Sequence, residues 1–273
     1  RPMVDLSLFQ RRTLLGSFLA MICYGASAQV MVFFLPLFLQ NAYGFEPMIA
    51  GLAMLPFAVP MVLAPRVTSS LATRFSGRAL LTAGLAISAV GNLIFWAVAR
   101  AQLPYSSFVA GMLVSGCGAG LLNGQTVKVL SGSVPRDRAG MASGLASTTR
   151  FIGILVSVAG MGAVLTNVMR HMFGNAARAA GLAPSDAAVA AKLVAAGDLS
   201  GMLEQVAPAA RGALRAAGLT SFADGFAAAS LLAACVAVLA CLLTVWFVRF
   251  EDTAPSAATG HRPCKFVDCR DPL

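Results

Sequence analysis

Six long stretches without a charged side chain decide what this chain can fold into. Reading between successive Asp, Glu, Lys and Arg residues gives 13–45, 47–65, 79–99, 101–127, 151–169 and 225–248, each at least 19 residues long. The next longest stretch, 139–149, has 11 residues. A helix needs about 20 apolar residues to cross a bilayer, at ~1.5 Å per residue. The pattern therefore predicts an all-α integral membrane protein with six transmembrane helices.

The composition excludes several other classes. Hydrophobic residues make up 58% of the 273 residues and charged residues only 11%, whereas a soluble domain has about 25% charged residues. A soluble enzyme, a nucleic-acid-binding domain and a disordered chain are all disfavoured. A large soluble core with buried helices would not need so many stretches of this length. The net charge of +9 is better explained by membrane topology than by nucleic-acid binding.

The same boundaries divide the chain into regions. We expect a cytoplasmic connector over 1–12, a bundle over 13–250 with an external loop at 170–222, and a disordered cytoplasmic tail over 251–273. Within the loop, Pro184-Ser185-Asp186 predicts the start of a helix that stops near Gly197, and a second helix is expected from about Ser200 to Ala217, interrupted at Pro208. The chain starts at Arg1 without a signal-peptide pattern, so we expect a fragment.

Basic residues predict the orientation. Nine Lys and Arg residues lie on the side of the N-terminus before the tail is counted, and the short loops of the opposite side contain only Arg100. Short loops with more basic residues stay in the cytoplasm. Both termini should therefore be cytoplasmic.

Arg150 is the most informative residue inside a predicted span. An arginine well inside a span costs at least ~2.5 kcal/mol, and such residues usually face the protein interior or a water-filled cavity. If the helix begins near Ala139, Arg150 lies near mid-membrane, about 18 Å beyond Arg138. If it begins nearer Leu145, the side chain can reach the cytoplasmic headgroups. The sequence leaves both alternatives open.

Other polar and small residues also lie within the spans. The polar candidates for substrate or coupling contacts are Tyr24, Gln29, Asn92, Asn123 and Gln125. Such residues more often form hydrogen bonds between helices than contacts with a ligand. Gly116, Gly120 and Gly124 share one helix face at a spacing of four, which predicts close helix packing and is compatible with a face that moves in a conformational cycle.

The residues needed for catalysis are missing from the spans. No Asp, Glu or His lies in any of the six stretches, and no nucleotide-binding glycine loop or Ser-His-Asp arrangement is present. Four of the six cysteines lie in apolar spans. Cys264 and Cys269 lie near His261 and Asp268, which we interpret as chance rather than as a zinc site. The sequence predicts no enzyme activity, no metal, no cofactor and no proton carrier in this chain.

Several motifs resemble the major facilitator superfamily. They are the run Leu35-Pro36-Leu37-Phe38-Leu39-Gln40 with Gly44, Pro47, Gly51 and Pro56, the opening Pro2-Met3-Val4-Asp5-Leu6, and Pro135, Gly140, Ala142-Ser143-Gly144, Arg150 and Gly153. The chain is most similar to the C-terminal half of the fourteen-helix drug:proton antiporters (EmrB/QacA-like), over about residues 2–250. In that pattern Gly140 and Gly144 are expected to serve helix packing.

The resemblance implies a secondary transporter of the plasma (inner) membrane. Two six-helix bundles would rock about a central site to export drug-like or amphipathic small molecules in exchange for protons. The partners would be the substrate, protons, the bilayer and a missing N-terminal half, which in the family holds most coupling carboxylates. No nucleic acid is expected.

One loop departs from the family pattern. Arg66, Arg74, Gly77 and Arg78 resemble a degenerate copy of the superfamily's cytoplasmic Asp-Arg-x-Gly-Arg loop, with Thr73 where the acid would be. Ser147 and Phe151 replace the Asn and Gln that often flank the arginine. A non-transporting six-helix scaffold or a degenerate transporter fragment is therefore the alternative function, and a membrane enzyme is a distant third.

Overall fold

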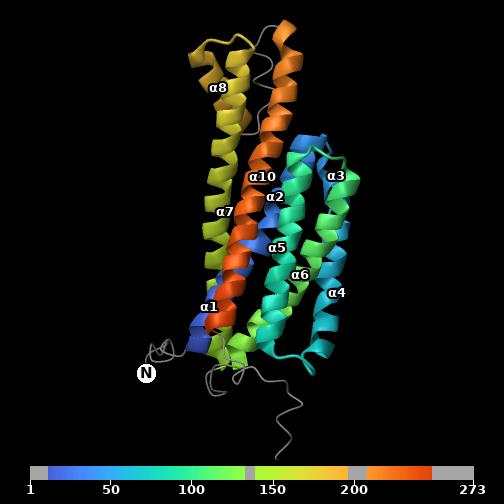
Figure 1. Cartoon of the computed structure of the whole chain (residues 1–273), viewed down its shortest axis with the longest axis vertical. Helices are drawn as coiled ribbons and strands as arrows, with labels where there is room; N and C mark the ends of the chain where they lie inside the picture. Colours follow the sequence, from blue (N-terminus) through green and yellow to red (C-terminus); the bar gives the residue numbers. More distant parts are fainter. Residues whose placement is uncertain (1–11, 133–138, 196–207, 248–273) are drawn as a thin grey trace, which may run out of the picture.

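Helices make up all the regular structure that the computed structural model describes, over residues 12–132, 139–195 and 208–247 (Figure 1). In chain order they are α1 (Arg12–Tyr24), the π-helical η2 (Gly25–Gln29), α2 (Val30–Tyr43), α3 (Pro47–Leu52), α4 (Leu55–Leu71), α5 (Gly77–Arg100), α6 (Tyr105–Gly132), α7 (Ala139–Ala179), α8 (Pro184–Ala195) and α10 (Pro208–Phe247). The expected tail at 251–273 and nearly all of the connector lie outside these residues.

Six helical segments are long and apolar enough to cross a membrane, which confirms the predicted number. The first combines α1, η2 and α2, and the second combines α3 and α4. The other four are α5, α6, α7 and α10. Proline is compatible with these spans: Pro36 lies inside α2, and Pro60 and Pro65 lie inside α4.

The segment 170–222, expected as an external loop, is largely helical where the structure describes it. Helix α7 has 41 residues and α10 has 40, against 24 in α5, so each extends about 60 Å. Both rise above α5 and α6, with α8 beside the upper end of α7 (Figure 1). Charged residues mark where an apolar span ends, but a helix can continue into water beyond them. The predicted helix start at Pro184 agrees with α8. Pro208 lies in the first turn of α10, where proline is tolerated, rather than at a kink.

Glycines on one face of α6 hold α4 close. A Cβ atom added at Gly116 would overlap the carbonyl oxygen of Phe57, and one added at Gly120 would lie 2.6 Å from Cβ of Ala64. At Gly124 the contact is looser, 3.8 Å from Cβ of Pro65. Small residues thus let two membrane helices approach to backbone contact.

Gly140 and Gly144 behave differently from the expectation of close packing. No atom of the described residues lies within 4 Å of a Cβ added at either position. Both residues are exposed. The close contact of α7 is made instead by Gly153, where an added Cβ would lie 2.8 Å from the carbonyl oxygen of Ile22.

The bundle leaves two of its spans largely uncovered. Only 11% of the most apolar part of the α3–α4 span and 22% of that of α7 are buried, against 69% for the first span. The uncovered side chains of α4 include Val59, Val62 and Val67. Those of α7 include Ile152, Leu155 and Val156.

The contact between α4 and α6 predicts a stability difference between two glycine substitutions. Gly116→Ala should lower the free energy of unfolding by about 1–3 kcal/mol, because the added methyl group must displace the backbone of α4. Gly160→Ala is the matched control, because nothing described lies within 4 Å of its added Cβ and alanine favours a helix by up to about 1 kcal/mol. Unfolding of the two variants in detergent measures the difference. Equal loss of stability would contradict this account of the packing.

Candidate functional site

A π-helical segment interrupts the first span near its middle. It covers Gly25–Gln29, between α1 and α2. Such segments are rare and frequently occur at functional sites. A Cβ added at Gly25 would lie 3.0 Å from the backbone nitrogen of Ile154 in α7. Together with Gly153 against Ile22, this makes a two-way backbone contact between the first span and α7.

A buried polar cluster lies against the other side of η2. We define it as Ser27 of η2, Ser88 and Asn92 of α5, and Ser115 of α6, all 0% exposed. Asn92 Nδ2 donates to the carbonyl oxygens of Ser27, at 2.9 Å, and Ser88, at 2.8 Å. Ser115 lies close by on α6, since a Cβ added at Gly91 of α5 would be 2.7 Å from Cβ of Ser115.

Four oxygen atoms of the polar cluster have no hydrogen-bond partner among the described residues. They are Asn92 Oδ1 and the hydroxyl oxygens of Ser27, Ser88 and Ser115. A buried polar atom without a partner costs about 1–3 kcal/mol. The cluster therefore retains capacity for further hydrogen bonds at the level of the helix interruption.

Arg150 lies at the same level, on the side of α7 that packs against the first span. Its backbone oxygen would be 3.3 Å from a Cβ added at Gly25. Its guanidinium carbon lies 5.5 Å from the ring centroid of Phe151, a side chain that is 56% exposed. The side chain of Arg150 makes no hydrogen bond or ion pair with the side chains and loops that the structure describes.

The start of α7 bears on the two alternatives for Arg150. The helix includes Ala139, eleven residues earlier, which corresponds to about 16 Å along the axis. A helix can extend beyond the membrane, so the depth of Arg150 stays a prediction. Its side chain is half-buried, on the face of α7 that also includes the buried residues Ala146 and Ser157.

The remaining polar candidates fall into two groups. Tyr24 is fully buried directly before η2, and Gln29 ends η2, with a side chain outside the described residues. Asn123 and Gln125 lie eight and ten residues beyond Ser115 on α6, about 12 and 15 Å along the helix. Tyr24 and Asn92 thus meet around η2, whereas Asn123 and Gln125 lie apart from it.

The loop between α4 and α5 contains the other predicted motif. Arg66 is exposed on α4, Arg74 is exposed between the helices, Gly77 begins α5, and Arg78 is half-buried in its first turn. The start of α5 is capped by Ser76, whose hydroxyl accepts a hydrogen bond from the backbone nitrogen of Ala79 at 3.3 Å. No carboxylate stands at the position of Thr73, which is exposed.

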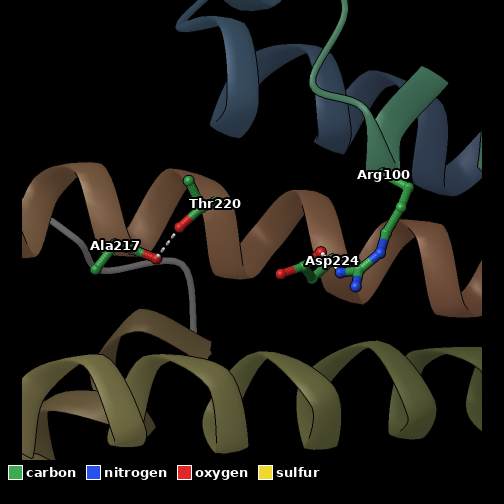
Figure 2. Close-up of polar contacts among 4 residues, drawn as sticks. All are labelled: Arg100, Ala217, Thr220 and Asp224. Atoms are coloured by element: carbon green, nitrogen blue, oxygen red, sulfur yellow. Dashed lines mark hydrogen bonds and ion pairs between the residues drawn. The ribbon is translucent and has the colours of Figure 1, made fainter.

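An ion pair joins two helices at the opposite end of the bundle. Arg100, the last residue of α5, donates to Asp224 of α10 at 2.7 Å (Figure 2). The side chain of Arg100 is 61% exposed and that of Asp224 is 21% exposed. The charge-free stretch of the last span begins at residue 225, so Asp224 lies at the edge of that stretch although α10 is continuous through it.

Sequence reasoning missed three serines and one glycine of this site. Ser27, Ser88 and Ser115 are single small polar residues in apolar spans, and only the spacing of four between Ser88 and Asn92 could have indicated a shared face. The need for glycine at position 25 comes from a close contact with α7, which is more than a hundred residues away in the sequence. Neither pairing is a local property of the sequence.

The polar cluster predicts a measurable role for one side chain. Asn92→Leu should lower the free energy of unfolding by about 1–2 kcal/mol, because the hydrogen bond to Ser27 joins α5 to η2. Asn41→Leu is the control, since Asn41 Nδ2 donates only to the carbonyl oxygen of Leu37 within α2. Unfolding followed by circular dichroism compares them. An Asn92 variant as stable as the Asn41 variant would contradict this role.

Comparisons with known proteins agree with this geometry. Multidrug efflux pump LfrA of Mycolicibacterium smegmatis is 30% identical over 193 residues, covering 71% of this chain and 38% of LfrA. Multidrug resistance protein Stp of Mycobacterium tuberculosis is 32% identical over 170 residues, covering 60% of this chain and 30% of Stp. The match thus covers 38% of LfrA and 30% of Stp, well under half of either relative.

A solved structure shares the fold. The crystal structure of a bacterial homolog of the human lysosomal transporter Spinster, in an inward-facing and unoccupied conformation, matches with a TM-score of 0.60 and 16% identity. The match covers 93% of this chain and 52% of that protein. Residues 2–194 match the Major Facilitator Superfamily. This multi-pass membrane chain therefore belongs to the major facilitator superfamily, a family of transporters rather than enzymes.

Proposed function

We propose that this chain is the C-terminal half of a fourteen-helix drug:proton antiporter (EmrB/QacA-like). The complete transporter would export drug-like or amphipathic organic molecules by alternating access, with a second bundle rocking against this one. The names of LfrA and Stp support the substrate class. The 52% coverage of a solved transporter of the same fold supports the assignment to one half.

The environment of Arg150 is the observation that carries this proposal. Its half-buried side chain places the guanidinium beside the exposed ring of Phe151, which borders the uncovered apolar face of α7. In lipid, an arginine at this depth costs at least ~2.5 kcal/mol. A second bundle packed on α7 would supply a carboxylate or a hydrated cavity for the fixed positive charge. The uncovered apolar face of α4 would pack on the same partner.

Proton coupling would reside mainly in the missing half. A proton carrier inside the membrane usually needs Asp, Glu or His, and none lies in the six charge-free stretches. Asp224 borders the last stretch and is paired with Arg100. In this proposal the chain contributes a fixed charge and hydrogen-bonding groups.

The alternative is a six-helix scaffold or degenerate fragment that does not transport. Thr73 in place of the loop acid favours it. Transport by the complete protein distinguishes the two functions. We expect the complete protein in liposomes to move a dye substrate when a pH gradient is imposed, and this chain alone to move none. A folded complete protein without such movement would support the scaffold, and gradient-driven movement by this chain alone would place a coupling site within it.

Arg150 should be needed for that transport. Arg150→Ala in the complete transporter should reduce efflux about tenfold or more, equivalent to about 1.4 kcal/mol, because it removes the charge at the proposed interface. Arg150→Lys should restore only part of the activity, since an ammonium lacks the planar fork of arginine. Arg215→Ala, which removes an exposed charge from α10, is the control. Efflux by Arg150→Ala equal to that of the control would contradict the role.

The proposed location is the plasma (inner) membrane with both termini in the cytoplasm. In a background without native cysteines, Ser185→Cys in α8 should react with an impermeant thiol reagent added to intact cells. Thr73→Cys in the loop between α4 and α5 should react only after the cells are opened. Both positions are exposed in the structure. The reverse labelling pattern would show that the orientation is inverted.

A further inference from the structure

A basic pocket lies between the outer part of α7 and α8. Its volume is about 360 Å³, within the range of small-molecule sites. Arg170, His171 and Arg178 of α7 and Lys192 of α8 line it. We refer to these four residues as the basic pocket. None of them takes part in the transport mechanism proposed above.

The two helices leave room for a ligand because their contact is made by small residues. A Cβ added at Gly174 of α7 would lie 4.0 Å from Cβ of Ala191 in α8. His171, Gly174 and Arg178 follow one another on α7 at spacings of three and four, which places them on one face. Longer side chains at Gly174 or Ala191 would fill the space that the four basic residues surround.

The charge of the pocket is unbalanced. No acidic residue is among the described residues that line it. Arg170 donates to Asn167 Oδ1 at 2.7 Å, and Arg178 donates to the carbonyl oxygen of Gly174 at 3.2 Å and to Asn175 Oδ1. These acceptors are neutral, so both guanidinium groups retain their charge and further donors. The nearest acid along α8, Asp186, accepts a hydrogen bond from Ser185 and does not line the pocket.

We expect the pocket to begin near the membrane surface. A Cβ added at Gly225 would lie 2.8 Å from the carbonyl oxygen of Leu165, and the neighbouring Asp224 pairs with Arg100 at the end of α5. Leu165 therefore marks the edge of the span. Arg170 and Arg178 lie about 7.5 and 20 Å further along α7. The polar headgroup layer extends roughly 5–8 Å beyond the hydrocarbon, so we expect Arg170 to reach it and Arg178 to lie in water.

We propose that the basic pocket binds a phosphate group of an anionic molecule. Arginine forks match the oxygens of phosphate geometrically and make charge-assisted hydrogen bonds, and several cations around one cavity raise the local concentration of anions. The phosphate can belong to an anionic lipid headgroup, which the lower rim would reach, or to a soluble phosphate ester. The site is independent of the transport function proposed above.

Binding to the full chain tests the proposal. The chain is placed in phosphatidylcholine nanodiscs and titrated with short-chain phosphatidylglycerol and, separately, with glycerol phosphate. Binding should weaken at least about tenfold, or ~1.4 kcal/mol, in the double variant Arg178→Gln with Lys192→Gln. Arg215→Gln, an exposed charge on α10 that does not line the pocket, should bind as the unmodified chain does. Circular dichroism checks that all variants are folded.

The outcomes separate the two sources of phosphate from a failed proposal. Saturable binding of phosphatidylglycerol but not of glycerol phosphate would assign the pocket to a lipid headgroup. Binding of both would assign it to the phosphate group itself. Binding of neither, or an equal loss in Arg215→Gln and the double variant, would overturn the proposal. Loss of phosphate binding would not contradict the proposed transport function, because the liposome experiment measures transport separately.

Discussion

Close backbone contact at glycines holds this bundle together. Lipid gives membrane helices no hydrophobic reason to associate, so packing and hydrogen bonds must provide the attraction. Gly116 and Gly120 bring α6 onto α4, and Gly25 and Gly153 bring the first span onto α7. The contact at Gly25 coincides with the π-helical η2. The positions of the polar cluster and of Arg150 both follow from this contact.

Two kinds of polar group lie at the level of η2. The polar cluster is enclosed by η2, α5 and α6, with Asn92 joining the first two. Arg150 of α7 is half-buried, with its guanidinium beside the exposed ring of Phe151. A buried cluster with unpaired oxygens and a charge on an apolar face are both expensive in a bilayer. In the proposed transporter, a second bundle and the hydrated cavity between the two halves would reduce the cost at Arg150.

Much of the fold could be predicted from charge alone, because the bilayer demands long apolar helices. The six spans, the start of α8 at Pro184 and the glycine face of α6 all followed from local patterns. The extension of α7 past Arg170 could not be predicted, since a charged residue ends an apolar span without ending a helix. The close approach of α7 to the first span at Gly25 and Gly153 joins residues far apart in the sequence, which periodicity does not reveal. Asn92 could be identified as a polar residue in a span, but its partner Ser27 could not.

The proposed function requires a second bundle to cover the exposed apolar face of α7, which includes Ile152, Leu155 and Val156. Leu155 of α7 and Leu239 of α10 are both exposed in this chain, at 68% and 56%. In the complete transporter, a fluorophore attached to Leu155→Cys or Leu239→Cys can be exposed to lipids that have a nitroxide quencher on their acyl chains. The account predicts strong quenching at position 239 and protection at position 155. Equal quenching at both positions would mean that α7 faces lipid, and would contradict the central claim.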